Sequence, residues 1–328
     1  MVKFGILGAG RIGKVHANTI ANSPRASIAY VADAIHEAAV SLAGSVGAQV
    51  SDVDAIIASD VDAILIATPT DTHADLIEKA ARAGKAILCE KPVSLSVERI
   101  EALLPVVEKA GVPLMIGFNR RFDPNFASLQ KRLREGDVGE VEIVTIISRD
   151  PAPPPVSYIA RSGGLYRDMM IHDFDMARFL VGEEFVSVSA IGGALVDKAI
   201  GTAGDVDTAA VQMQTASGKI AVITNSRRAT YGYDQRIEVH GSQGMLRAGN
   251  VHMTTLERAD RAGFTQDVIQ NFFIDRYVAA YSAEVNTFID AMANGTTPTP
   301  SGYDGLQAQK LAEAATKSSQ TGQVVRVA

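Results

Sequence analysis

The hydrophobic pattern in the first third of the chain alternates between short apolar runs and longer amphipathic segments. The short runs predict buried strands at residues 2–7, 27–32, 62–67, 86–89 and 113–117. The amphipathic segments predict helices at residues 14–22, 72–83 and 96–110. Strands that alternate with helices in this way are typical of a parallel sheet covered on both faces.

The pattern changes after Asp123. A helix predicted to end near residue 134 is followed by closely spaced strands, and the turn residues between them favour a mostly antiparallel sheet. These strands are predicted at residues 141–148, 186–195, 206–214, 219–225, 235–240 and 244–248. The proline-rich piece 151–155 cannot lie inside a sheet and is expected to be a loop. Two helices, at residues 275–293 and 303–318, are predicted to close the chain.

A glycine-rich turn follows the first predicted strand. Gly8, Gly10 and Gly13 stand in the spacing Gly-x-Gly-x-x-Gly between an apolar strand and a helix, which is the context that a dinucleotide fingerprint requires. Gly8 permits the tight turn, Gly10 lets the backbone approach a pyrophosphate, and Gly13 lets the helix pack closely on the strand. The helix N-terminus, at Arg11 and Ile12, is then expected to face the phosphates.

The second predicted strand ends in Asp33, an acidic residue at the position that contacts the adenosine ribose in this type of site. A carboxylate there accepts hydrogen bonds from the ribose hydroxyls and repels a 2′-phosphate. Ala34 and Ile35, which follow, supply no cation for such a phosphate. The sequence therefore favours NAD over NADP as the cofactor.

The length of 328 residues exceeds the size that one core usually supports, about 250 to 300 residues. We therefore predict an α/β protein with two domains. The first, residues 1–120, is an NAD-binding Rossmann domain. The second, residues 121–328, is a substrate-binding and oligomerisation α/β domain with a large, mostly antiparallel, open-faced sheet.

Asp168, His172 and Asp175 lie four and seven residues apart in an otherwise apolar stretch, residues 163–180. On one continuous α-helix these three residues would share a face and form a polar stripe. A carboxylate beside a buried imidazole can hold the histidine pKa near the operating pH, which suits proton transfer. The alternative is a salt-linked core pair that orients the helix, because structural ion pairs also perturb pKa values.

Composition narrows the class of protein. The net charge of −6 without a basic patch argues against a nucleic-acid partner. No run of about 18 apolar residues predicts a membrane span, and the N-terminus lacks a secretory layout, so we expect a cytoplasmic protein. The single cysteine, Cys89, excludes an internal disulfide and a cysteine metal cluster, and no histidine has metal-site spacing, so we expect no metal.

Several separated motifs resemble the glucose-fructose oxidoreductase, inositol dehydrogenase and MocA family. They are the N-terminal fingerprint, Glu90-Lys91-Pro92 after the strand 86–89, and Asp168-x-x-x-His172. The resemblance covers essentially the whole chain. Residues 148–155, 163–164, 171–179 and 225–236 resemble the inositol 2-dehydrogenase branch most closely.

This resemblance implies NAD-dependent oxidation of a secondary hydroxyl of a cyclic polyol, myo- or scyllo-inositol, to the inosose. It implies that His172 takes the hydroxyl proton, that Asp168 orients the imidazole ring, and that Lys91 hydrogen-bonds the reacting oxygen. Asp175 would bind a substrate hydroxyl. Two alternatives stay open: a dehydrogenase of glucose-type pyranoses, and a non-catalytic NAD(H)-binding sensor. The joint presence of Lys91, Asp168 and His172 speaks against the sensor.

Further residues are assigned around these. Thr68, Pro69 and His73 follow a predicted strand and are expected to border the cofactor, with His73 on the cofactor side or capping a helix. Glu90 is assigned to the same cofactor-binding edge. Asn119, Arg121 and Tyr233 are expected to contact substrate hydroxyls, although an arginine at the domain boundary serves equally to tie two domains together.

The resemblance also implies a cis Lys91-Pro92 bond. The open sheet face predicts a homo-oligomer, a tetramer or a dimer. The sequence leaves open whether the last helix packs back on the first domain.

Overall fold

The computed structural model describes residues 1–327, which form two compact units. Unit 1 contains Met1–Phe122 and Ala280–Gln309, and unit 2 contains Asp123–Ala279 and the chain from Lys310 onward. The predicted Rossmann fold and the predicted mostly antiparallel second sheet are both confirmed. No helix in the described part of the chain is long and apolar enough to cross a membrane.

Unit 1 is built on a six-stranded parallel sheet with the order β3-β2-β1-β4-β5-β6. The strands are β1 (Val2–Leu7), β2 (Ala26–Ala32), β3 (Gln49–Val50), β4 (Ala63–Ile66), β5 (Ala86–Glu90) and β6 (Leu114–Gly117). The strand order reverses between β1 and β4. In open α/β sheets, ligands bind beyond the carboxyl ends of the strands at such a switch point.

Helices connect these strands, and two of them, His36–Val46 and Val53–Ala58, are not predicted from the sequence pattern. They are α1 (Arg11–Ala21), α2 (His36–Val46), α3 (Val53–Ala58), α4 (His73–Arg82) and α5 (Val97–Ala110), with short 3₁₀ turns at Thr70–Thr72 and Asn119–Phe122. The capping residues agree with the sequence pattern: Ser96 accepts a hydrogen bond from the Arg99 amide at the start of α5, and Gly111 ends that helix in the left-handed conformation.

A late segment of the chain completes the core of unit 1. Val285, Phe288 and Ile289 of α12 (Val278–Asn294) pack in the same cluster as Phe4, Leu65 and other buried residues of the sheet and of α1 and α2. The Phe4 and Phe288 ring centroids lie 6.0 Å apart. The last long helix, α13 (Gly302–Thr321), belongs to unit 1 up to Gln309.

Unit 2 is built on a seven-stranded sheet with the order β12-β11-β7-β10-β9-β8-β15. The strands are β7 (Val141–Arg149), β8 (Phe185–Gly193), β9 (Thr208–Thr215), β10 (Ile220–Ser226), β11 (Asp234–Gly241), β12 (Gly244–Ala248) and β15 (Val325–Arg326). Only the pairing of β7 with β10 is parallel among these described strands. The helices are α6 (Pro124–Arg134), α7 (Val156–Ser162), α8 (Gly164–Asp168), α9 (Ile171–Val181), α10 (Lys198–Thr202) and α11 (Phe273–Arg276).

The two faces of the second sheet differ in burial. Along β10, Ala221 and Ile223 are fully buried, whereas Ile220 keeps 38% of its surface exposed and Val222 is half-buried. Ile143 of β7 and Ile191 of β8 are also exposed. One face therefore carries the core, and the other leaves several apolar side chains accessible in the single chain.

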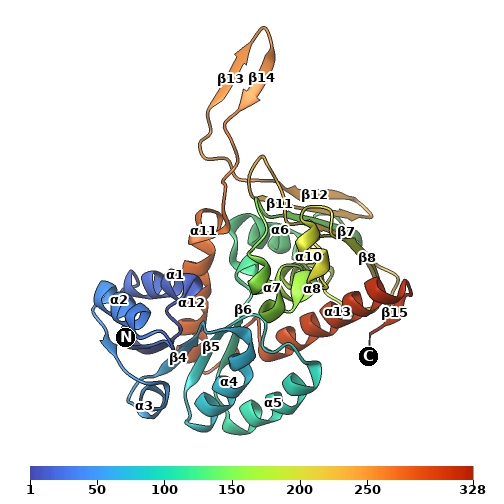
Figure 1. The fold of residues 1–328 in the computed structure, drawn as a ribbon. Helices are drawn as coiled ribbons and strands as arrows, with labels where there is room; N and C mark the ends of the chain where they lie inside the picture. Colours follow the sequence, from blue (N-terminus) through green and yellow to red (C-terminus); the bar gives the residue numbers. More distant parts are fainter. Residues whose placement is uncertain (328) are drawn as a thin grey trace. The chain divides into compact units, whose positions relative to one another are not determined.

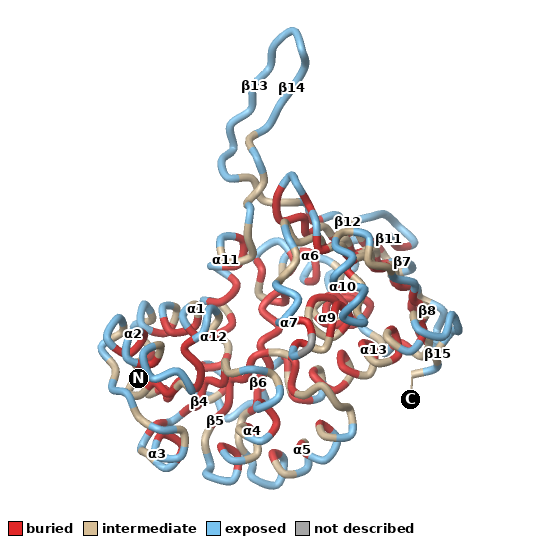
Figure 2. Tube along the Cα trace, in the orientation of Figure 1, coloured by how far each residue is buried: buried red, intermediate tan, exposed pale blue. Residues whose placement is uncertain are grey.

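A β-hairpin that the sequence does not predict extends from unit 2. It is formed by β13 (Glu257–Asp260) and β14 (Gly263–Gln266), and Figures 1 and 2 show it as an exposed arm.

The polar stripe requires one continuous helix through Asp168, His172 and Asp175, and this expectation is wrong. The segment forms α8 and α9, with a break at Met169 and Met170. The Met169 and Met170 amides both donate to the Leu165 carbonyl, at 3.0 and 2.9 Å, which shifts the hydrogen-bond register by one residue. The segment predicted as one helix over 275–293 is also interrupted, at Tyr277 between α11 and α12.

Candidate functional site

The glycine turn after β1 has the geometry that the fingerprint requires. Gly8 has a φ of +107°, and a Cβ there would lie 2.4 Å from the Ala67 carbonyl oxygen. A Cβ on Gly13 would lie 2.0 Å from the Gly8 carbonyl oxygen. A Cβ on Gly10 would meet no described atom within 4 Å. Packing therefore demands glycine at the first and third positions, while Gly10 leaves the backbone open to a ligand at the start of α1.

The Asp33 carboxylate lies beside this turn. Its Oδ2 accepts a hydrogen bond from the Ala9 amide at 2.6 Å, and its Oδ1 accepts one from the Ile35 amide at 2.8 Å. A carboxylate oxygen accepts more than one hydrogen bond, so both atoms retain capacity for hydroxyl donors. The side chain is held in place at the carboxyl end of β2, and this arrangement fits an adenosine ribose.

The Glu90-Lys91-Pro92 segment follows β5 at the same edge of the sheet, and its Lys91-Pro92 bond is cis, as the resemblance implies. Glu90 Oε1 lies 2.7 Å from His16 Nε2, and Glu90 Oε2 accepts a hydrogen bond from the Lys91 backbone amide at 3.2 Å. Burial raises the pKa of Glu90, but the His16 hydrogen bond and the nearby positive charge outweigh it and lower the pKa. Glu90 is therefore an ionised carboxylate that holds the backbone of Lys91.

His73 links the two loops that follow β4 and β5 through its ring nitrogens. Its Nδ1 lies 2.8 Å from the Pro92 carbonyl oxygen, and its Nε2 lies 2.8 Å from the Thr68 carbonyl oxygen. The residue is 1% exposed, and burial lowers its pKa. It is the first residue of α4, and these contacts make it a support for Thr68 and Pro92.

Asn119, Arg120 and Arg121 are all buried on the 3₁₀ turn after β6. Arg121 Nη2 donates to Asp304 Oδ1 at 2.8 Å, which joins this turn to the start of α13 within unit 1. The structure thus places the Arg121 guanidinium in an ion pair inside one unit.

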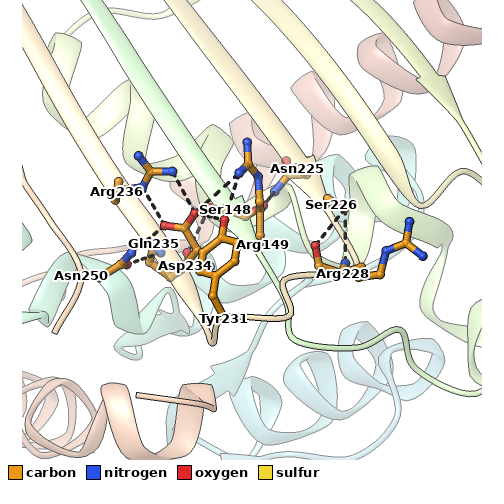
Figure 3. A network of polar contacts seen from close by, with 10 residues as sticks. All are labelled: Ser148, Arg149, Asn225, Ser226, Arg228, Tyr231, Asp234, Gln235, Arg236 and Asn250. Carbon is orange, nitrogen blue, oxygen red and sulfur yellow. Dashed lines mark hydrogen bonds and ion pairs between the residues drawn. The ribbon is translucent and has the colours of Figure 1, made fainter. Parts of the chain in front are cut away.

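In unit 2, a row of three buried polar side chains crosses the sheet. The register pairs Ser148 of β7 with Asn225 of β10 on one side and with Gln235 of β11 on the other. Figure 3 shows these residues on neighbouring strands. Each is at most 2% exposed, so we expect these side chains to find hydrogen-bond partners inside the protein.

Two of the three residues bind Asp173 in the first turn of α9. Ser148 Oγ donates to Asp173 Oδ1 at 2.6 Å, and Asn225 Nδ2 donates to Asp173 Oδ2 at 2.8 Å. Ser148 Oγ also lies 3.0 Å from the Gln235 side-chain amide. The row therefore anchors the start of α9, where half-buried His172 precedes Asp173. The sequence interpretation missed Asp173, although an acidic residue in the first turn of an apolar helix is a detectable signal.

Asp168 lies at the end of α8, not on the helix that carries His172. Its carboxylate accepts hydrogen bonds from the Tyr158 hydroxyl at 3.2 Å and from Arg227 Nη2 at 3.3 Å. The predicted polar stripe is therefore wrong, because the helix break at residues 169–170 separates Asp168 from His172 and Asp175. Asp175 lies on α9 with His172, is 1% exposed, and lies 3.9 Å from Arg178 Nη1.

A second polar network surrounds Asp234 (Figure 3). This buried carboxylate accepts hydrogen bonds from Arg236 Nε at 2.7 Å, from the Tyr231 hydroxyl at 2.7 Å and from Asn250 Nδ2 at 2.7 Å. Burial raises the pKa of Asp234, but these hydrogen bonds outweigh it and lower the pKa. Neighbouring Tyr233 is 6% exposed and packs edge-on against Tyr277, so it lies in the core.

Comparison with protein families finds two matches that together span most of the chain. Residues 2–118 match the oxidoreductase family with an NAD-binding Rossmann fold, and residues 126–247 match the GFO/IDH/MocA C-terminal domain.

Individual proteins show the same likeness. The chain is 57% identical over 318 residues to an inositol 2-dehydrogenase of Rhizobium meliloti (strain 1021), covering 97% of this chain and 96% of that protein. A crystal structure of a myo-inositol dehydrogenase from Corynebacterium glutamicum superposes with a TM-score of 0.96 at 42% identity, covering 100% and 99% of the two chains. A structure of scyllo-inositol dehydrogenase from Lactobacillus casei with bound NAD(H) and scyllo-inositol gives a TM-score of 0.93 at 29% identity, covering 100% and 99%.

Proposed function

Because this chain belongs to the GFO/IDH/MocA family of NAD-binding oxidoreductases, we propose that it oxidises a secondary hydroxyl of myo- or scyllo-inositol to the inosose. The near-full-length identity to an inositol 2-dehydrogenase is the observation that carries this proposal. When bound, NAD⁺ supplies the acceptor for the hydride that leaves the carbinol carbon.

The residues that would hold the cofactor follow the carboxyl ends of β1, β2, β4 and β5. Gly8, Gly10 and Gly13, with Arg11 and Ile12, would receive the pyrophosphate at the N-terminus of α1. Asp33 would accept hydrogen bonds from the adenosine ribose, and its charge would disfavour a 2′-phosphate. Thr68 and Pro69 would border the cofactor on the loop that His73 supports.

In this proposal, Lys91 donates a hydrogen bond to the reacting oxygen and stabilises the negative charge that develops there. Glu90 contributes by holding the Lys91 backbone, since its carboxylate accepts a hydrogen bond from the Lys91 amide.

His172 is the proposed general base, which takes the hydroxyl proton as the hydride leaves. The Asp173 anchor fixes the helix turn that carries it. Asp168 would stabilise the imidazolium through its negative charge. Its carboxylate also forms an ion pair with Arg227. Asp175, Asn119, Arg121 and Tyr233 remain proposed substrate contacts, although each is largely buried in this structure.

The accessible apolar face of the second sheet supports a homo-oligomer, a tetramer or a dimer, in which a second copy covers that face. The proposed setting is cytoplasmic, with a small-molecule polyol as the partner. Residues 1–120 are proposed to bind NAD and residues 121–328 to bind the substrate and mediate oligomerisation, except that Ala280–Gln309 belongs to the unit that contains residues 1–122.

A substrate screen tests the proposal. Purified protein with NAD⁺ is offered myo-inositol, scyllo-inositol, chiro-inositols and both glucose enantiomers, and NADH absorbance is followed. We expect kcat/KM for myo- or scyllo-inositol to exceed that for either glucose by about tenfold or more. A preference for glucose would favour a pyranose dehydrogenase. Turnover of none of these compounds, by folded protein that binds NADH, would favour a non-catalytic sensor.

A further inference from the structure

Glu284 of α12 is a buried acid with no evident structural purpose. It is 0% exposed, and neither carboxyl oxygen has a hydrogen-bond partner among the described residues. Burying a polar group without a partner is costly, so such a residue requires an explanation.

Its surroundings contain a second acid. Burial raises the pKa of Glu284 well above its ordinary value, and the negative charge of Glu90 raises it further. Glu90, in contrast, is kept ionised chiefly by His16. The pKa values of these two buried carboxyl groups are therefore shifted in opposite directions.

His16 and α12 meet at this place. The Tyr281 ring, one turn before Glu284, packs edge-on against the His16 ring with centroids 5.2 Å apart. Glu90 is acceptor-only when ionised, so His16 Nε2 carries the proton in the 2.7 Å contact to Glu90 Oε1. The charged and titratable groups around this contact are His16 on α1, His73 on α4, Cys89, Glu90 and Lys91 in or after β5, and Tyr281 and Glu284 on α12.

The neighbouring strand leaves room for the Glu90 carboxylate. A Cβ on Gly117 of β6 would lie 3.1 Å from Glu90 Cδ and 3.2 Å from Glu90 Oε2, the atom that accepts the Lys91 amide. The Glu90 side chain is thus enclosed by β6 on one side and bonded to His16 on another.

We propose that His16 is a positioning residue, which holds the Glu90 carboxylate against the backbone amide of Lys91. The inference deepens the proposed function and rests on the role that it gives to Lys91. His16 holds Glu90 by donating to it. Burial and the negative charge of Glu90 raise the pKa of Glu284, so Glu284 favours its neutral form.

The test compares glutamine and leucine at position 16. His16→Gln keeps a donor for Glu90, whereas His16→Leu fills the space with an apolar side chain. We expect kcat with the preferred inositol to fall about tenfold or more in His16→Leu, and less than about threefold in His16→Gln. The NADH dissociation constant should change little in both variants.

A packing role would give the opposite order, because leucine suits a buried site at least as well as glutamine. Equal kcat in the glutamine and leucine variants would overturn the proposal. Gln309→Leu is the matched control. It removes a buried amide of unit 1, which donates a hydrogen bond to the Leu95 carbonyl. It should lower thermal stability without changing kcat.

The pH profile supplies a readout that loss of packing would not move. Without its donor, Glu90 becomes harder to ionise, so kcat of His16→Leu should rise with pH relative to His16→Gln. Parallel pH profiles would contradict the role assigned to His16.

A readout independent of turnover separates this inference from the proposed function. With NADH bound, the acetylation rate of Lys91 by acetic anhydride is measured by mass spectrometry relative to exposed Lys109. If the wild-type protein oxidises no polyol, the proposed function is wrong. The inference is then tested by the acetylation rate of Lys91 alone. We expect His16→Leu to change the Lys91 rate severalfold and His16→Gln to leave it unchanged. The same Lys91 rate in all variants would overturn the inference.

Discussion

Asn225 donates a hydrogen bond to Asp173 across 2.8 Å, linking strand β10 to the first turn of the helix that carries His172. Both side chains are at most 2% exposed. Ser148 completes the link by donating to the other carboxylate oxygen at 2.6 Å. The position of His172 is thus supported by buried polar groups that come from two parallel neighbouring strands.

Asn225→Leu should therefore weaken both stability and turnover. It leaves the buried Asp173 carboxylate with one donor fewer, which should lower the free energy of unfolding by about 1–3 kcal/mol. Denaturant titration measures this loss. Gln212→Leu is the control, because it makes an amide-to-leucine change at an exposed position of the same sheet, and it should stay within about 0.5 kcal/mol of the wild type. An equally small effect of Asn225→Leu would show that the contact does not support α9.

The buried Glu284 predicts an unusual pH dependence of stability. Its pKa is raised in the folded state, so the folded protein holds a proton that the unfolded chain releases above the ordinary glutamate pKa of 4.5. The wild type therefore loses stability as pH rises from that value towards the folded-state pKa. Glu284→Gln removes this loss. Between pH 4.5 and the folded-state pKa, the free energy of unfolding of the variant should gain on that of the wild type by up to about 1.4 kcal/mol per pH unit, and this gain is its stability advantage.

Thermal unfolding at several pH values measures that advantage. We expect Glu284→Gln and the wild type to be similar near pH 4 and to diverge as pH rises. A constant difference across the range would mean that Glu284 titrates normally in the folded protein.

Cofactor preference depends on Asp33 in this scheme. Asp33→Ser combined with Ile35→Arg should shift preference from NAD towards NADP, because it removes a repulsive charge and supplies a cation from a position that is 64% exposed. Asp33 also holds the Ala9 and Ile35 amides, so Asp33→Ser alone should weaken binding of both cofactors. Dissociation constants for NADH and NADPH test this. Equal use of both cofactors by the wild type would refute the assignment.

His172→Ala should lower kcat by about 10²- to 10⁴-fold while leaving NAD affinity nearly unchanged. Lys91→Ala should lower kcat by a comparable factor. If both residues act on one transition state, the double variant should be far less than multiplicatively worse. Steady-state kinetics and NADH titration provide the comparison, and near-normal turnover of folded His172→Ala would leave the reaction without an identified base.

The cofactor edge was predictable because its residues are local to strand ends. The glycine turn, Asp33 and Glu90-Lys91 each follow an apolar run directly, and parallel strands bring their carboxyl ends to one edge. The break at Met169 was not predictable in the same way. Neither methionine disfavours helix, and the segment contains no proline or internal glycine there.

Two other features depend on contacts between distant segments. The row formed by Ser148, Asn225 and Gln235 requires the register of three strands, and alternation of apolar residues along one strand does not specify its partner. The pairing of His16 with Glu90, and the place of Glu284 near them, depends on how α1 and α12 pack on the sheet. Side-chain chemistry alone carries no signal of that packing.

Transfer of a labelled hydride tests the proposed reaction most directly. With myo-inositol deuterated at C2 and unlabelled NAD⁺, the wild-type protein should produce NADH that carries one deuterium, together with the inosose, and mass spectrometry detects both. Unlabelled NADH, or oxidation at another carbon of the ring, would contradict the assignment as an inositol 2-dehydrogenase.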